Sequence, residues 1–167
     1  TPDPELHEMD TPYLLEELEY LPDSAGAGTW RGGLGVRYRW RVLADGIACA
    51  TYGSGFIEET RPKGLIGGST AIQQELRVMR AGGSTEMLET NNFYTLNTGD
   101  IVEVISSGGG GFGDPAQREP EKVLKDVLNG VVSVENARDI YRVDVDVENR
   151  CIREAQTEEL RTVSVVN

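Results

Sequence analysis

"GVRYRWRVLADGIACATYG", residues 35–53, carries the clearest structural pattern in this chain. Over residues 36–42, apolar or aromatic side chains alternate with three arginines, and this period of two is typical of a strand with one buried face. Asp45-Gly46 is a favoured pair for a type I′ turn. The stretch therefore predicts a β-hairpin in which residues 47–52 return beside the first strand.

The segments that follow also favour strands, and the pattern changes after residue 113. Residues 71–80 fit a helix or a strand, and the Gly82-Gly83 turn favours a second hairpin. Residues 97–106 predict a turn and a short buried strand. Proline at the first helical position after Glu119, and Ser133 as an N-cap, predict two helices. The fold class expected is mixed α+β, with mainly antiparallel β hairpins forming a sandwich- or barrel-like domain, followed by two short C-terminal helices.

These patterns divide the chain into three expected regions. Residues 1–24, rich in proline and acidic residues, predict an extended N-terminal arm, although residues 13–21 fit one or two helical turns as well as a strand. Residues 25–113 form the expected β-rich domain. Residues 114–167 form the expected helical C-terminal segment.

Composition narrows the class of partner. The 167 residues have a formal net charge of −12, which disfavours binding to nucleic acid or to an anionic membrane. No apolar run approaches the ~20 residues that a membrane helix needs. Cys49 and Cys151 are far apart in sequence, and two buried thiols in a cytoplasmic protein are favoured over one disulfide.

The residues alone do not reveal a self-contained active site. His7 is the one histidine, and a single histidine on an arm is expected to be solvated. Cys49 lies in an expected strand, where a small buried side chain is the simpler interpretation. The "GGGGFG" run is no Walker A loop, because it lacks the Gly-Lys-Ser/Thr ending. The catalytic residues are unknown from the sequence, and no metal site is predicted on this chain.

The row formed by Arg37, Arg39 and Arg41 has two interpretations. Arginines on one strand face can clamp a carboxylate or a phosphate. Salt bridges to acidic residues on a neighbouring strand or on a partner subunit are the favoured alternative.

Four stretches of the chain occur in a distinctive order and spacing: "LPDSAGAGTWRGGLGVRYRWRVL" at 21–43, "RPKGLIGG" at 61–68, "NTGDIVEVISSGGGGFGDP" at 97–115 and "EPEKVLKDVLNGVVSVENARDIYRV" at 119–143. Together they resemble one family, the hydantoinase B type, which is the B component of ATP-dependent hydantoinases and 5-oxoprolinases and has relatives in acetone and acetophenone carboxylases. The resemblance covers residues 11–143 and only the C-terminal portion of the family's B component.

The resemblance implies one part of a hetero-oligomeric, ATP-dependent enzyme. A hydantoinase-A-type subunit would bind ATP and Mg and phosphorylate a carbonyl or lactam oxygen. The B component would then open a cyclic amide (a hydantoin, oxoproline or lactam) or carboxylate a ketone, in a site closed to water. The resemblance also implies a larger N-terminal part of the B component, which is missing from this sequence and in which a divalent metal is possible. This chain is therefore expected to be a fragment or a separately encoded subunit that is inactive alone.

The resemblance also suggests a role for the four glycines at 108–111, at the junction between a core strand and the C-terminal helices. They permit positive φ and close approach of another backbone, and their N–H groups can form an anion-binding nest. A tight structural junction is the favoured interpretation; a substrate or phosphate path and a flexible hinge remain open. The residues expected in substrate or interface loops are Arg31, Arg61, Lys63, Gly67, Gly68, Gly108, Gly109, Gly110 and Gly111.

Two other functions remain open. The chain can be a non-catalytic, acidic, β-rich assembly or binding module that docks on a basic partner. An independent small β-barrel enzyme is disfavoured, because histidine is nearly absent and no Cys-His or acid pair stands out.

Overall fold

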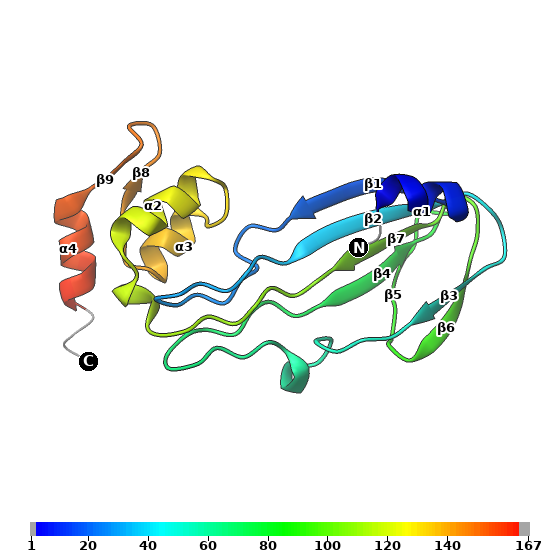
Figure 1. The fold of residues 1–167 in the computed structure, drawn as a ribbon, viewed down its shortest axis with the longest axis horizontal. Coiled ribbons are helices and arrows are strands. Elements are labelled where there is room, and N and C mark those ends of the chain that lie inside the picture. Colours follow the sequence, from blue (N-terminus) through cyan, green and yellow to red (C-terminus); the bar gives the residue numbers. More distant parts are fainter. Residues whose placement is uncertain (1–2, 164–167) are drawn as a thin grey trace. The chain divides into compact units, whose positions relative to one another are not determined.

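The computed structural model describes residues 3–163, which form two compact units, each built from three separate stretches of the chain (Figure 1). The first, here called the sheet unit, comprises Thr1–Glu19, Val36–Arg61 and Gln73–Ser106. The second, here called the glycine–helix unit, comprises Tyr20–Gly35, Pro62–Ile72 and Ser107–Asn167. The three regions expected from the sequence are continuous stretches that meet at residues 24 and 113, whereas each of these units is assembled from separate stretches. The expected boundaries stay a prediction.

The sheet unit contains a five-stranded sheet and a two-stranded sheet. The order in the larger sheet is β1-β2-β7-β4-β5, and its strands are β1 (Tyr13–Tyr20), β2 (Val36–Val42), β7 (Ile101–Ile105), β4 (Glu75–Met79) and β5 (Thr85–Met87). The smaller sheet pairs β3 (Ile47–Thr51) with β6 (Asn92–Leu96). Helix α1 (Pro4–Asp10) and the short 3₁₀ helix η1 (Glu58–Thr60) complete the unit.

The two sheets of this unit share one apolar core. Alternate residues of β7 show how it is built: Val102 and Val104 point into the core, while Glu103 between them faces the other side of the sheet. Val78 and Leu96 are fully buried in the same core, and the first of them comes from the larger sheet and the second from the smaller. On β2, Val42 is fully buried in this core and Tyr38 packs against it. The period-two pattern of the sequence therefore identified the inward face of β2 correctly.

The expected hairpin between residues 36–42 and 47–52 is wrong. β2 pairs in antiparallel register with β7, for example Arg39 with Glu103, whereas β3 pairs with β6 in the smaller sheet. A type I′ turn needs positive φ at both central residues. Here the φ of Gly46 is positive, at 72°, but the φ of Asp45 is not. The turn instead binds the 97–100 turn, since the Asp45 carboxylate accepts from the Thr98 N–H at 2.9 Å.

The other strand predictions of this unit are confirmed. Residues 75–79 form a strand, and β4 pairs with β5 across a turn in which Gly83 has a φ of 90°. The turn at 97–100 and the buried strand after it are also present, as β7. Residues 13–20, which fitted a helix or a strand, form β1.

The glycine–helix unit contains the expected C-terminal helices. α2 (Pro120–Leu128) begins with proline at its first position, and Gly130, with a φ of 68°, follows its C-cap. α3 (Val134–Asp139) is capped by the Ser133 hydroxyl, which accepts from the Asn136 N–H at 3.1 Å. Beyond the two expected helices, the unit has the 3₁₀ helix η2 (Pro115–Gln117), the short pair β8 (Val145–Asp146) and β9 (Cys151–Ile152), and α4 (Glu154–Val163).

The predicted fold class, a mixed α+β protein with antiparallel sheets, is confirmed; the choice between a sandwich and a barrel stays a prediction. In the described range 3–163, no helix has both the length and the apolar character needed to cross a membrane. Cys49 and Cys151 are both free thiols, as expected, but the expectation that both are buried is wrong, because Cys49 is half-buried and Cys151 is exposed.

Candidate functional site

Three glycine-rich segments, at residues 24–35, 62–72 and 107–113, pack against one another within the glycine–helix unit. We call them the glycine cluster. The N–H of Gly26 donates to the Gly109 carbonyl at 2.8 Å, and the N–H of Gly111 donates to the Ser69 carbonyl at 3.0 Å. Each segment is hydrogen-bonded to both of the others. The cluster is therefore held together by its backbones, with almost no side chains between them.

The close approach of these backbones explains why glycine is required. A Cβ added at Gly111 would lie 1.9 Å from the Ala27 carbonyl oxygen, and one added at Gly110 would lie 2.0 Å from the Lys63 carbonyl oxygen. Of the four glycines at 108–111, all within the described range, none has a φ in the left-handed region. The expectation that positive φ matters at these positions is therefore wrong, because it is contact between backbones that excludes a side chain.

The hydrogen bonds of the four glycines at 108–111 limit their capacity to bind an anion. The N–H groups of Gly109 and Gly111 donate to the carbonyls of Gly33 and Ser69. Because these two donors are already used inside the cluster, they are not available to hold an anion.

Arg31, an expected loop residue, lies in the first segment of the glycine cluster and takes part in an ion-pair network. Its Nε and an Nη bind the two oxygens of Asp126, each at 3.2 Å, and its other Nη donates to the Gly32 carbonyl at 2.9 Å. Arg118 also binds Asp126, at 2.9 Å, and donates to the Thr29 carbonyl at 3.0 Å. These contacts connect α2 to the first glycine-rich segment.

The structure brings most of the expected loop residues together, but not all. Lys63, Gly67 and Gly68 lie in the glycine–helix unit with Arg31 and residues 108–111, while Arg61 belongs to the sheet unit and pairs with Glu58. Gly68 packs against the Gly111 carbonyl, which a Cβ would approach to 2.2 Å, and Gly67 has a φ of 87°.

The arginine row on β2 forms salt bridges, as favoured. Arg39 binds Glu103 at 2.5 Å and Glu17 at 2.9 Å, and Arg77 from β4 binds Glu103 from the other side. Burial acts to raise the pKa of Glu103, but the hydrogen bonds from the two arginines outweigh it and hold that pKa below its usual value. Arg41 pairs with Glu16 at 2.5 Å. Together with Arg77, the row therefore connects β1, β2, β7 and β4 through ion pairs.

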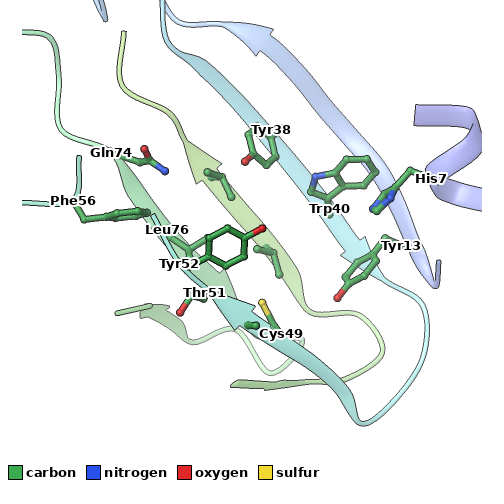
Figure 2. Close-up of a pocket in the computed structure, with 13 residues that line it drawn as sticks. His7, Tyr13, Tyr38, Trp40, Cys49, Thr51, Tyr52, Phe56, Gln74 and Leu76 are labelled. Carbon is green, nitrogen blue, oxygen red and sulfur yellow. The ribbon is translucent and has the colours of Figure 1, made fainter. Parts of the chain in front are cut away.

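The sheet unit also has a cavity that sequence reasoning missed. It has a volume of about 250 Å³ and opens on the core face of the larger sheet (Figure 2). Its floor is apolar and buried, formed by Leu76, Val102 and Val104. Most of its walls are aromatic rings, those of Tyr13, Tyr38, Trp40, Tyr52 and Phe56. We call it the aromatic cavity.

His7 and Cys49 both line this cavity. The His7 ring is half-buried, 4.7 Å from the Trp40 ring in an edge-on arrangement and 6.0 Å from the Tyr13 ring in a stacked one. The interpretation of His7 as a solvated side chain is therefore wrong, since α1 places it against β2. Cys49 is half-buried in β3, and burial raises the pKa of its thiol.

Burial also raises the pKa of the Tyr38 and Tyr13 hydroxyls, so both are uncharged at neutral pH. Among the described residues that line the cavity, none is Asp, Glu, Lys or Arg. Throughout residues 3–163, moreover, no group of three or more His, Cys, Asp or Glu side chains is arranged to hold a metal.

Comparison with known proteins identifies relatives. The sequence profile of the family described as Hydantoinase B/oxoprolinase matches residues 1–115. The caprolactamase subunit beta of Pseudomonas jessenii is 33% identical over 149 residues, which cover 86% of this chain and 25% of that protein.

Two solved structures share the fold. The ATP-dependent caprolactamase from Pseudomonas jessenii aligns with a TM-score of 0.78 and 31% identity, over 96% of this chain and 28% of that one. A nucleotide-free acetone carboxylase aligns with a TM-score of 0.79 over 97% of this chain and 26% of that one, and at 22% identity it supports the fold alone. The chain thus spans about a quarter of the length of the relatives it matches.

Proposed function

This chain belongs to the hydantoinase B/oxoprolinase family, and we propose that it is the C-terminal part of the B-type component of an ATP-dependent enzyme that opens a cyclic amide. In this proposal an A-type subunit uses ATP to phosphorylate the amide oxygen, which makes the ring carbon a better electrophile. The remainder of the B component then completes a site closed to water, where hydrolysis takes place. This chain contributes structure and contact surface to that assembly.

One observation favours a cyclic amide over a ketone as the substrate. The caprolactamase subunit matches at 33% identity, and the caprolactamase structure at 31% over 96% of this chain. The match to acetone carboxylase is of similar geometric quality but has only 22% identity, and it therefore carries no information on the reaction. Ketone carboxylation remains the alternative.

The glycine cluster is the proposed contact surface with the rest of the enzyme. Three large apolar side chains lie on neighbouring segments of it, since Trp30 and Leu65 each form a backbone β-bridge with Phe112. The side chains are exposed: Trp30 by 63%, Leu65 by 62% and Phe112 by 45%. Exposed apolar groups gathered in this way are typical of interfaces. The expected loop residues Arg31, Lys63, Gly67, Gly68 and 108–111 keep their proposed role as substrate or interface loops on this basis. Arg61 lies in the sheet unit, and its expected role stays a prediction.

Ile66 supports the same proposal, because it is strained and exposed at once. It is 77% exposed, and its φ of 50° is followed by a φ of 87° at Gly67, in a turn closed by a 3.0 Å hydrogen bond from the Gly68 N–H to the Leu65 carbonyl. Such turns favour Asn-Gly, and a β-branched residue there is unfavourable. A strained apolar side chain facing solvent has a use in binding that offsets its cost to folding.

The reaction is tested on the complete gene product that contains this chain, purified with its A-type partner. We expect ATP hydrolysis to depend on an added lactam or hydantoin, and ring-opened product to form in proportion to the ADP released. Ketone-dependent incorporation of labelled bicarbonate, without lactam turnover, would replace this reaction with carboxylation. Turnover by the 167-residue chain alone would contradict the proposed division of labour.

The contact surface is tested by Ile66→Asn, with Ile57→Asn as the matched control, since Ile57 is 57% exposed in the sheet unit. Ile66→Asn relieves the strained turn and is expected to preserve or raise stability while weakening co-purification with the A-type subunit. Unchanged assembly in Ile66→Asn, or equal weakening in both variants, contradicts the proposed surface.

A further inference from the structure

The smaller sheet of the sheet unit has one open edge. Its two strands, β3 and β6, each form one side of it. In an antiparallel pair, successive residues alternate between bonding to the partner strand and facing away from it. The Thr51 carbonyl accepts from the Asn91 N–H at 2.7 Å on the β6 side, so the backbones of Ala50 and Ala48 face away from β6. We call this side of β3 the open edge.

The backbone groups of the open edge have no other partner in the described chain. Within residues 3–163, no hydrogen bond from outside the β3–β6 pair reaches the N–H or C=O of Ala48 or Ala50, and both residues are exposed. Neither β3 (IACAT) nor β6 (NFYTL) contains a charged residue or a proline. Because each residue carries one N–H and one C=O, Ala48 and Ala50 offer donors and acceptors to a further strand.

The other strand edges of the unit are protected. On β6, the Thr95 carbonyl accepts from the Arg80 guanidinium at 2.9 Å. On β1, the Leu15 N–H donates to the Glu8 carboxylate at 2.8 Å. β5 has only three residues, and one of them, Glu86, pairs with Arg80 at 2.7 Å. Charged side chains and very short strands are usual means of preventing an edge from pairing with another strand. Within the described residues β3 has no such charge at its open edge, which is therefore available for pairing.

The aromatic cavity borders the open edge. Cys49 of β3 lines it on one side, and Trp40 and Tyr13 line it on the other (Figure 2); Ala50 is also part of the lining. Two strands cover only part of the apolar face of five, and a third strand beside β3 would cover more of it, with every second side chain pointing toward the floor. The cavity of about 250 Å³ accepts at least one large apolar side chain, because about 150 Å³ is enough for a benzene ring.

We propose that the open edge binds a third strand, and that this strand comes from the part of the B-type component that lies outside these 167 residues. This chain covers only 25% of the caprolactamase subunit and 28% of the solved caprolactamase chain, so most of a component of that size remains to supply the strand. Addition of a strand to a sheet edge is a common mode of recognition between polypeptides. The inference rests on the proposed function for the source of the strand.

The chemistry of the added strand follows from its surroundings. The described lining of the cavity contains no Asp, Glu, Lys or Arg, so the side chains that point inward are apolar. On the outer face of the smaller sheet, Ala50 lies directly opposite Phe93, and both are exposed, so the side chains that point outward have apolar neighbours as well. The bound segment is therefore extended and uncharged, and it has no proline where it donates to β3.

Hydrogen exchange of the complete gene product, without substrate or ATP, tests the inference. We expect the amides of Ala48 and Ala50 to exchange about tenfold or more slowly than in an unstructured peptide, because each donates to the added strand. The Met87 amide is the internal control. The Leu88 N–H donates to the Leu76 carbonyl on β4 at 2.8 Å, so Met87 faces the edge of β5 and should exchange freely. Exchange of Ala48 and Ala50 at the rate of an unstructured peptide overturns the inference. Protection that is lost on dilution assigns the strand to a second copy of the chain and also overturns it.

A proline at the open edge removes one donor without touching β6. Proline is tolerated on an edge strand where its missing N–H faces away from the partner, so Ala50→Pro should leave the amide of Leu96 on β6 protected. With the added strand displaced, the Cys49 thiol in the cavity should react with iodoacetamide about tenfold faster. Cys151, which is exposed in the other unit, is the internal reference and should react as before. Unchanged reactivity of Cys49 overturns the inference.

Met87→Pro is the matched control variant, since it removes an edge N–H from β5 instead. It should leave the reactivity of Cys49 unchanged, and an equal rise in both variants overturns the assignment of the open edge. These measurements need no turnover. A gene product that opens lactams but leaves Ala50 unprotected contradicts this inference alone, whereas one that protects Ala50 but has no ATP-dependent activity contradicts the proposed function alone.

Discussion

The sheet unit and the glycine cluster are held together in opposite ways. In the sheet unit, alternate side chains such as Val78 and Leu96 fill a core between two sheets. In the glycine cluster the hydrogen-bonded backbones themselves come together, and a single methyl group at Gly111 would meet the Ala27 carbonyl oxygen at 1.9 Å. The sheet unit depends on the side chains that it has, and the glycine cluster depends on side chains that it lacks. The helices beside the glycine cluster have an apolar core of their own, which includes Val123 and Val143.

This difference determines how each unit responds to substitution. A core side chain made smaller leaves a cavity into which its neighbours partly relax. A backbone contact cannot relax in that way, because moving one segment of the glycine cluster breaks its hydrogen bonds to the other two. The smallest possible addition to the cluster should therefore destabilise more than the removal of a large side chain from the sheet core.

The largest effect is expected from Gly111→Ala. The added Cβ would overlap the backbone of residues 26–27, with contacts of 1.9 and 2.4 Å to Ala27, and rigid overlap of this kind belongs to the rare class of substitutions that cost about 4 kcal/mol or more. Chemical denaturation of the chain followed by tryptophan fluorescence measures the loss. Hydrogen exchange at the Ser69 and Gly26 amides reports whether the cluster has opened.

Gly33→Ala is the matched control, since within the described residues nothing lies within 4 Å of a Cβ added there. It should be neutral or slightly stabilising, by up to about 1 kcal/mol, because alanine restricts the unfolded chain. If both variants lose the same free energy of unfolding, backbone contact is not what requires glycine in the cluster.

A smaller loss is expected from Leu96→Ala in the sheet unit. Leu96 is fully buried in the core that the two sheets share, and truncation of such a leucine costs about 3 kcal/mol. Leu6→Ala, at a residue that is 61% exposed on α1, should change the free energy of unfolding by less than about 0.5 kcal/mol. A loss for Leu96→Ala larger than that for Gly111→Ala would reverse the comparison between the units.

The same contrast explains which elements the sequence predicts correctly. The alternation at residues 36–42 depends only on the local environment of β2, and it predicts correctly which face of this strand is turned to the core. The partner strand depends on pairing with β7 some sixty residues away, as in Arg39 opposite Glu103, and no local turn signal contains that information. The helix signals at Pro120 and Ser133 are local, and both are confirmed.

The candidate sites were predictable to different degrees. The glycine-rich segments stand out in composition, and the resemblance to a family placed them at a junction, but the mutual contacts of three segments far apart in sequence are not visible in any one of them. The aromatic cavity is less predictable still. Tyr38 and Trp40 lie on the inward face by alternation, yet the cavity exists because the smaller sheet leaves part of that face uncovered.

The smallest expected effect separates charge from packing in the sheet unit. Glu103 is fully buried between Arg39 and Arg77, and Glu103→Gln keeps its shape while removing its charge. Charge-assisted hydrogen bonds contribute about 2 kcal/mol, and both arginines are about one-third exposed, so water can partly solvate them in the variant. We therefore expect a loss of about 2 kcal/mol at pH 7, below that of Leu96→Ala.

The pH dependence of this loss identifies its cause. Because the arginines hold the pKa of Glu103 below its usual value, the carboxylate stabilises the fold fully above the ordinary glutamate pKa of about 4.3, and this contribution disappears as the pH falls through the lowered pKa. The difference in free energy of unfolding between wild type and Glu103→Gln should therefore shrink below pH 4.3. Glu119→Gln, at an exposed pair with Lys122, should show almost no difference at any pH. A Glu103→Gln difference that stays constant down to the acid limit of folding would mean that this residue acts by packing, as its apolar neighbours on the other face of β7 do.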